Sequence, residues 1–246
     1  MVTKSSLKFI KSLKLKKYRQ QEKYYVIEGR KGIEEALKSG LPIEQVIGTE
    51  SFGIWLEKNA LLTDVSFESV NQRTLEGISS FQSNNTGVAV APIIDHELQE
   101  EGPRIILDGV RDPGNLGTII RSMDWFGFKT LICSPDCADC YNPKTLAATM
   151  GSFTRLVPHY MNLESYLSDR PELPVYGMLL GGKPMEGMPL PEEAAYLLGS
   201  ESHGIREPLL PFVKNKIAIT QFGGAESLNV AMATTILLYA MRATPV

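Results

Sequence analysis

The sequence has no apolar run of the roughly 18 residues that a membrane-spanning helix needs. Its first residues are basic and interrupted by lysines, unlike the apolar core of a secretory signal. Cysteine is also scarce: the three cysteines lie between positions 133 and 140, and an odd cluster does not form the disulfide framework of a small secreted domain. We therefore expect a cytoplasmic protein with no membrane partner.

A surplus of positive charge is missing as well, although phosphate contacts normally require one, because the formal net charge is -3. Residues 1–23, however, contain eight basic residues and one acid, a balance of +7 that leaves -10 for the remainder. This segment predicts a surface for a nucleic-acid backbone, with candidate contacts at Lys11, Lys14, Lys16, Lys17 and Arg19, and at Arg30 beyond it. A solvated amphipathic helix explains the segment equally well, since Leu7, Ile10 and Leu13 recur near helical spacing.

The hydrophobic pattern divides the chain into two α/β regions. Short β-type runs alternate with helical stretches such as Gly32–Lys38 in the first region, and the expected strands are Tyr24–Glu28, Gln45–Gly48, Val65–Val70 and Gly87–Ala91. An acidic, aperiodic stretch ending in Pro103 predicts a linker over 96–103, between a domain at 1–95 and a domain at 104–246. The second domain alternates strands with helix-length segments, which predicts a mostly parallel sheet; its expected strands are Arg104–Asp108, Lys129–Cys133, Val175–Leu179, Ala195–Gly199 and Lys216–Thr220.

The first expected strand of the second domain ends in GVRDPGN, followed by a helical pattern that stops at Gly127. We expect Asn115 to be the N-cap of this helix. Arg121 lies off the apolar stripe, and an exposed ion pair with Asp124 is its ordinary interpretation. Ligands of open α/β sheets collect at this edge of the sheet, which favours a functional interpretation.

Two further segments follow strands in the same way. YLLGSESHGI places Gly199, Ser200 and Glu201 after an apolar strand, and a plain connection with Glu201 in a first helical turn would explain it. QFGGAESLN leads into a helix for which Ser227 is the expected N-cap.

Together, the strings DGVRDPGNLGTIIRSMDWFGF, LLGSESHGI and IAITQFGGAESLNVAMATTILL resemble motifs one, two and three of the SpoU (TrmH-like) branch of the SPOUT methyltransferases. The resemblance covers nearly all of residues 104–242, and the first domain is similar in outline to a ribosomal-protein-L30e-like substrate-binding domain. It implies an RNA ribose 2'-O-methyltransferase that uses S-adenosylmethionine, folds with a deep trefoil knot and acts as a homodimer. The sequence departs from the family pattern at Ala147, where a basic residue is common, and at Thr220, where proline is frequent.

The resemblance also implies roles for individual residues. Cofactor contacts fall on Gly199, Ile219 and Leu228, with Leu198 and Ala225 as lesser candidates, and catalytic or RNA-positioning roles fall on Asn115, Arg121, Glu201, Ser227 and Asn229. A guanidinium has a pKa above about 12 and is a poor base, so we assign Arg121 to stabilising the developing 2'-oxyanion. Asn115 and Arg121 are expected to serve a site shared between two subunits. Ribosomal RNA is favoured slightly over transfer RNA.

Other classes remain to be weighed against this interpretation. Cys133, Cys137 and Cys140 have the C-x3-C-x2-C spacing of radical S-adenosylmethionine enzymes, or could hold zinc with His159, but we expect buried structural thiols and no metal. A ribosome-assembly factor that has lost methyl transfer is the non-enzyme alternative. A nicotinamide-dependent oxidoreductase is disfavoured because no G-x-G-x-x-G follows a strand.

Overall fold

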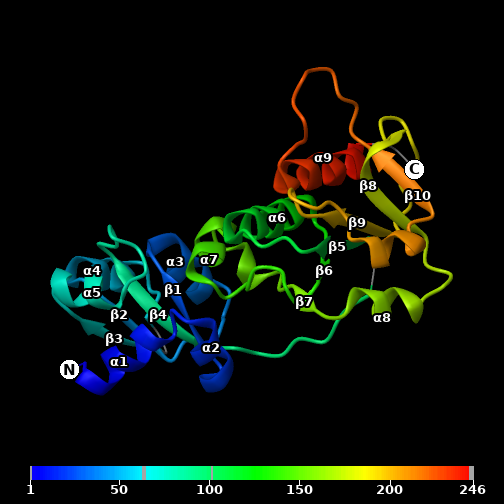
Figure 1. Ribbon diagram of the computed structural model, residues 1–246. Coiled ribbons are helices and arrows are strands. Elements are labelled where there is room, and N and C mark those ends of the chain that lie inside the picture. The colour runs from blue at the N-terminus through cyan, green and yellow to red at the C-terminus, as the bar shows by residue number, and fades with distance from the viewer. Residues whose placement is uncertain (1, 63–64, 101, 244–246) are drawn as a thin grey trace. The chain divides into compact units, whose positions relative to one another are not determined.

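The computed structural model describes residues 2–62, 65–100 and 102–243, and it divides into two compact units (Figure 1). The first is Met1–His96 with Tyr141–Thr154, and the second is Glu97–Cys140 with Arg155–Val246. The segment 141–154 belongs by its contacts to the first unit, where Leu146 and Phe153 enter the hydrophobic core. The contacts thus assign residues 141–154 to a different unit from the expected domain at 104–246. The linker expected over 96–103 stays a prediction.

Within its described residues, the first unit contains a four-stranded sheet in the order β1-β4-β2-β3. β4 is antiparallel to β1 and β2, whereas β3 is parallel to β2. The strands are β1 (Tyr24–Glu28), β2 (Gln45–Gly48), β3 (Ser66–Ser69) and β4 (Gly87–Pro92), and the helices are α1 (Lys4–Ser12), α2 (Lys16–Glu22), α3 (Arg30–Lys38), α4 (Glu50–Lys58), α5 (Gln72–Ile78) and α7 (Pro143–Thr149). The four strands expected here are present, with ends that differ by at most one residue.

The second unit contains a six-stranded sheet in the order β10-β8-β9-β5-β6-β7, and every pairing in it is parallel. The α/β class and the mostly parallel sheet are therefore confirmed. Helices α6 and α9 lie on one face of the sheet, and α8 lies with the 3-10 segment η2 on the other (Figure 1). The elements are β5 (Arg104–Asp108), α6 (Pro113–Phe126), β6 (Thr130–Cys133), η1 (Ser152–Thr154, in the first unit), β7 (His159–Tyr160), α8 (Leu163–Ser168), β8 (Val175–Pro184), β9 (Ala195–Gly199), η2 (Glu207–Phe212), β10 (Asn215–Ala218) and α9 (Val230–Ala243).

The longest strand, β8, pairs with β10 in two separate pieces. Lys216 pairs with Gly177, but the next residue, Ile217, pairs with Lys183. The residues of β8 between these partners have no counterpart in β10, and Gly181 among them has a left-handed φ of 75°. The ladder between β8 and β10 is therefore interrupted over residues 178–182 of β8.

No helix in the described part of the chain is both long enough and apolar enough to cross a bilayer.

Candidate active site

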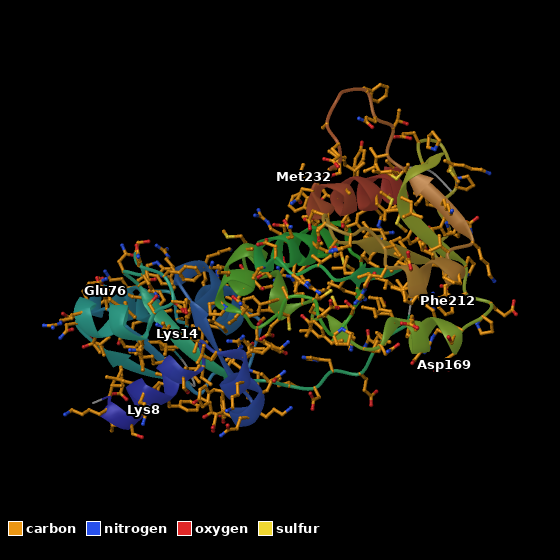
Figure 2. All side chains as sticks on the ribbon, in the orientation of Figure 1. Lys8, Lys14, Glu76, Asp169, Phe212 and Met232 are labelled. Atoms are coloured by element: carbon orange, nitrogen blue, oxygen red, sulfur yellow. The ribbon has the colours of Figure 1, made fainter. Side chains whose placement is uncertain are left out.

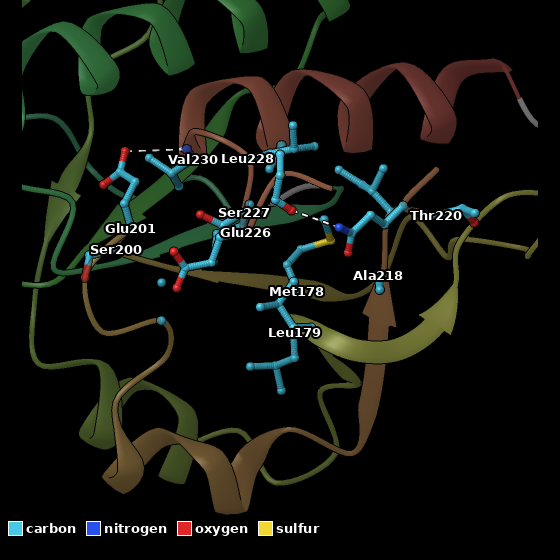
Figure 3. Close-up of a pocket in the computed structure, with 18 of the residues that line it drawn as sticks. Met178, Leu179, Ser200, Glu201, Ala218, Thr220, Glu226, Ser227, Leu228 and Val230 are labelled. Atoms are coloured by element: carbon cyan, nitrogen blue, oxygen red, sulfur yellow. Dashed lines mark hydrogen bonds between the residues drawn. The ribbon is translucent and has the colours of Figure 1, made fainter. Parts of the chain in front are cut away.

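A cavity of about 620 Å³ lies at the carboxyl ends of β8, β9 and β10 (Figure 3). Its wall is largely apolar, and it includes the interrupted part of β8, the turn after β9 and the segment that connects β10 to α9. All the residues expected at the cofactor line it, namely Leu198, Gly199, Ile219, Ala225 and Leu228. Met178, Leu179 and Leu180 also line the cavity and were not predicted, because their place in the wall depends on the register shift between β8 and β10.

The turn after β9 is compact because glycine occupies two of its positions. A Cβ atom on Gly199 would lie 1.9 Å from the carbonyl carbon of Gly204, so no larger residue fits there. Gly204 has a φ of 61° and donates its N–H to the carbonyl of Ser200 at 2.8 Å. Glu201 therefore lies in a tight turn, and the alternative interpretation, a plain connection with Glu201 in a first helical turn, does not describe this segment.

The Glu201 carboxylate meets the side chains of Asn115 on α6 and Asn229 at the start of α9, at one end of the cavity. Its Oε1 accepts a hydrogen bond from Asn115 Nδ2 at 2.5 Å and another from Asn229 Nδ2 at 3.4 Å. Asn229 Nδ2 also donates to Asn115 Oδ1 at 3.0 Å, and the Val230 N–H points to Glu201 at 3.5 Å, as Figure 3 shows. Three of the five residues expected at the reaction centre thus meet, and a fourth, Ser227, lines the cavity.

Both N-cap predictions are wrong, because neighbouring residues cap the two helices. Asp112 caps α6 by accepting from the N–H of Asn115 at 2.8 Å, since Pro113 occupies the first helical turn and has no N–H to offer. Asn229 caps α9 by accepting from the N–H of Ala231 at 2.9 Å, and Ser227 lies outside the helix. These shifts leave the Asn115 side chain free to contact Glu201.

Arg121 lies apart from this cluster. It is exposed on α6, six residues after Asn115, which is about 9 Å along a helix, and it does not line the cavity. The alternative interpretation, an ion pair with Asp124, does not hold among the described residues: Asp124 accepts from Arg155 at 2.8 and 3.0 Å instead. Arg121 makes no hydrogen bond or ion pair with another described residue.

A smaller polar cavity of about 110 Å³ adjoins the same turn and shares Ser200, Glu201 and His203 with the larger one. The buried Asp108 carboxylate lines it and accepts from Arg206 twice, from the backbone N–H at 2.8 Å and from Nε at 2.6 Å. The hydrogen bond with Asp108 raises the pKa of Arg206 above its ordinary value. Sequence reasoning did not single out this pair, because its members lie 98 residues apart.

The threonine at position 220, where the family pattern frequently has proline, has a local explanation. The Thr220 N–H donates to Glu186 Oε1 at 3.0 Å, and its hydroxyl donates to Oε2 at 2.9 Å. The backbone hydrogen bond also lowers the pKa of Glu186. Proline could supply neither donor, so threonine ties the cavity wall to the end of β8.

The basic residues of the first unit divide into structural and exposed ones. Arg19 is buried, and its Nη1 donates at 2.8 Å to the carbonyls of Leu13 and Lys14. Lys14 donates to the carbonyl of Ser79, and burial lowers its pKa. Both therefore stabilise the fold and are poorly placed for phosphate contacts. The other candidates are exposed, Lys11, Lys16, Lys17 and Arg30; Figure 2 marks Lys8 and Lys14 on this unit.

The three cysteines are buried, and none of them forms a disulfide bond. Burial raises the pKa of Cys133, whereas a hydrogen bond from the Cys133 thiol lowers the pKa of Cys137 to about 7. Among the described residues, no group of three histidine, cysteine or acidic side chains is arranged to hold a metal ion.

A parallel sheet with a ligand-sized cavity at its carboxyl edge defines the general class, an α/β protein of the open-sheet type. Residues 102–239 match the SpoU rRNA Methylase family, and residues 4–89 match the MRM3-like substrate binding domain. The chain belongs to the SpoU methylase family.

Similar proteins span almost the whole chain. The "23S rRNA (guanosine(2553)-2'-O)-methyltransferase RlmP" of Bacillus subtilis is 31% identical over 235 residues, which cover 94% of each chain. A solved structure from Porphyromonas gingivalis, described as of the TrmH family, has a TM-score of 0.85 at 32% identity and covers 98% of both chains. An AdoMet-bound rRNA methyltransferase from Sinorhizobium meliloti has a TM-score of 0.81 at 27% identity, covering 99% of this chain and 96% of its own.

Proposed function

We propose that this protein transfers a methyl group from S-adenosylmethionine to a ribose 2'-hydroxyl in structured RNA, with ribosomal RNA favoured over transfer RNA. The observation that carries the proposal is the meeting of Asn115, Glu201 and Asn229 at one end of an apolar cavity. Membership of the SpoU family and the activity named for the Bacillus subtilis relative support the same reaction.

The larger cavity suits the cofactor in size and character. Sites for drug-sized ligands measure about 300–1,000 Å³ and are mainly apolar with a few polar groups, as this cavity is. Leu198, Gly199, Ile219, Ala225 and Leu228 would hold the cofactor, and the small residue at 199 lets the backbone approach it. When bound, S-adenosylmethionine supplies an electrophilic methyl carbon.

The side chains around the cavity orient the ribose for an in-line displacement. Glu201, fixed by two asparagines, accepts a hydrogen bond from a ribose hydroxyl, and Arg121 stabilises the oxygen as its negative charge develops. The hydroxyl proton leaves to water, an oxygen–carbon bond forms, the carbon–sulfur bond breaks, and neutral S-adenosylhomocysteine is released. Ser227 shapes the wall between cofactor and nucleotide.

The assembly follows from the position of Arg121. Because this side chain does not reach the cavity of its own chain, we assign it to the cavity of a second copy, in a cytoplasmic homodimer formed by the second units. Met232 and Tyr239, seven residues apart on α9, are 56% and 62% exposed and offer apolar surface for that contact (Figure 2 marks Met232). The first unit binds the RNA, and the second folds with the knot of its family.

The test is methyl transfer from radiolabelled S-adenosylmethionine to ribosomal RNA transcribed in vitro, followed by mapping of the modified nucleotide. Arg121→Ala should abolish transfer and leave the cofactor dissociation constant within about twofold, since the side chain acts on the oxyanion. Lys129→Ala removes an exposed cation from the same unit and should stay active. An active Arg121→Ala protein contradicts the assigned role, and a wild-type protein that does not bind the cofactor contradicts the proposed function.

A further inference from the structure

The formal charges that line the larger cavity are of one sign. Among the described lining residues, Glu201 and Glu226 are the acidic residues, and neither lysine nor arginine is present. The rest of the wall is mostly apolar side chains and glycine. A carboxylate here can act on a bound charge over several ångströms, because no lysine or arginine among the described lining residues neutralises it.

The two carboxylates are used differently by the protein. Glu201 is hydrogen-bonded by Asn115 and Asn229, so its charge is partly satisfied within the chain. Glu226 makes no hydrogen bond or ion pair with any other described residue. Figure 3 shows its side chain projecting into the cavity from the segment that precedes α9. The Glu226 carboxylate is thus available to interact with a charge on the ligand.

The ligand changes charge during the proposed reaction. The methyl donor carries a positive sulfonium, and transfer of the methyl group to oxygen leaves a neutral thioether. The amino-acid part and the adenosine are the same before and after transfer. A negative cavity therefore stabilises the donor more than the spent product.

We propose that Glu226 makes the cavity selective for the cationic donor over the neutral product, so that loss of the sulfonium charge promotes product release. This inference rests on the proposed function. For two opposite unit charges about 8 Å apart, at an effective dielectric constant of about 40, Coulomb's law corresponds to a preference of about fivefold. The preference must fall as salt is added, because Glu226 is exposed.

Calorimetric titration of the full-length protein tests this role. The ligands are S-adenosylmethionine, S-adenosylhomocysteine and sinefungin, which carries an ammonium where the donor has its methyl sulfonium. Glu226→Gln should weaken the two cationic ligands by about fivefold and change binding of the neutral product by less than about twofold. Glu207→Gln is the matched control, because Glu207 is exposed in the same unit and does not line the cavity. It should leave all three affinities unchanged.

The other outcomes contradict the proposal. If Glu226→Gln weakens all three ligands equally, the carboxylate binds a group that donor and product share. If it weakens none, or if 1 M salt leaves the wild-type preference unchanged, the charge of Glu226 does not act on the ligand. Wild-type protein that binds none of the three contradicts the proposed function itself, which separates the two failures. An unchanged midpoint of thermal unfolding verifies that the exposed substitution leaves the fold intact.

Discussion

Asn229 uses both halves of its side-chain amide. The oxygen accepts from Ala231 and caps α9, while the nitrogen donates to Asn115 and Glu201. One residue therefore fixes where the helix begins and where the Glu201 carboxylate points. Small movements of the helix end are therefore transmitted directly to the Glu201 carboxylate.

Two substitutions separate these roles. Asn229→Asp keeps an acceptor for the helix N-terminus but presents a second carboxylate to Glu201, so activity should fall at least tenfold with little loss of the cap. Asn229→Ala removes both and should also lower the free energy of unfolding by about 1 kcal/mol. Urea unfolding and methyl-transfer rates measure the two effects. Equal stability of the two variants would show that the cap contributes nothing.

Residue identities at the site follow from the sequence better than residue positions do. Each residue expected at the cofactor lines the cavity, because the motifs fix which residues follow each strand. The helix caps were misplaced because Asp112 and Asn115, and likewise Ser227 and Asn229, are all competent caps. Which of them acts depends on contacts with distant residues, such as Glu201 for Asn115, that local sequence does not contain.

At the scale of elements, Asp108 fixes both ends of the turn that carries Glu201. Its backbone stands opposite Gly199 in the β5–β9 register, and its carboxylate holds Arg206, where the turn ends. The turn is thus closed onto the last residue of β5. This arrangement explains how a short irregular segment can present a carboxylate in a fixed direction.

Removing the Arg206 guanidinium should loosen the turn that carries Glu201. Arg206→Met leaves the buried Asp108 carboxylate without its charged partner, and we expect a loss of about 2 kcal/mol in unfolding free energy with a fall in kcat larger than the rise in KM. The double variant Asp108→Asn with Arg206→Met should recover part of the stability, because no buried charge is left unpaired. A double-mutant cycle in urea measures the coupling, and strictly additive losses would contradict it.

Strands were the most predictable elements, because a continuous apolar run between turn residues is a local signal. The strands expected around the cavity are present, although β8 runs five residues beyond its expected end at Leu179. The two-residue β7 was not expected, since so short a strand has no pattern of its own. The interrupted pairing of β8 escaped prediction because register is decided by the partner strand.

At the scale of the whole molecule, the proposed dimer rests on the position of Arg121, which does not line the cavity of its own chain. An interface on α9 would bury Met232 and Tyr239 and could bring Arg121 of one protomer to the cavity of its partner. In a closed two-fold dimer the same contact is made twice, giving two equivalent sites. Each site would then depend on both chains.

Mixing inactive variants tests the shared site. Arg121→Ala and Glu201→Gln should each be inactive, but co-expressed they form mixed dimers in which one site is intact. Random pairing makes half of the dimers mixed, so about a quarter of the wild-type activity should return. Tyr239→Glu should instead yield a monomer by sedimentation equilibrium. No recovery from mixed dimers, with dimerisation verified, would place Arg121 at its own chain's site.

The segment 141–154 has a consequence for the ancestry of the protein. It lies within the SpoU match at 102–239, yet Leu146 and Phe153 complete the hydrophobic core of the other unit. A recombination event that joined a new RNA-binding module at residues 96–103 would separate that core from two of its own side chains. The halves are therefore expected to have been inherited together, with substitutions in one matched by substitutions in the other.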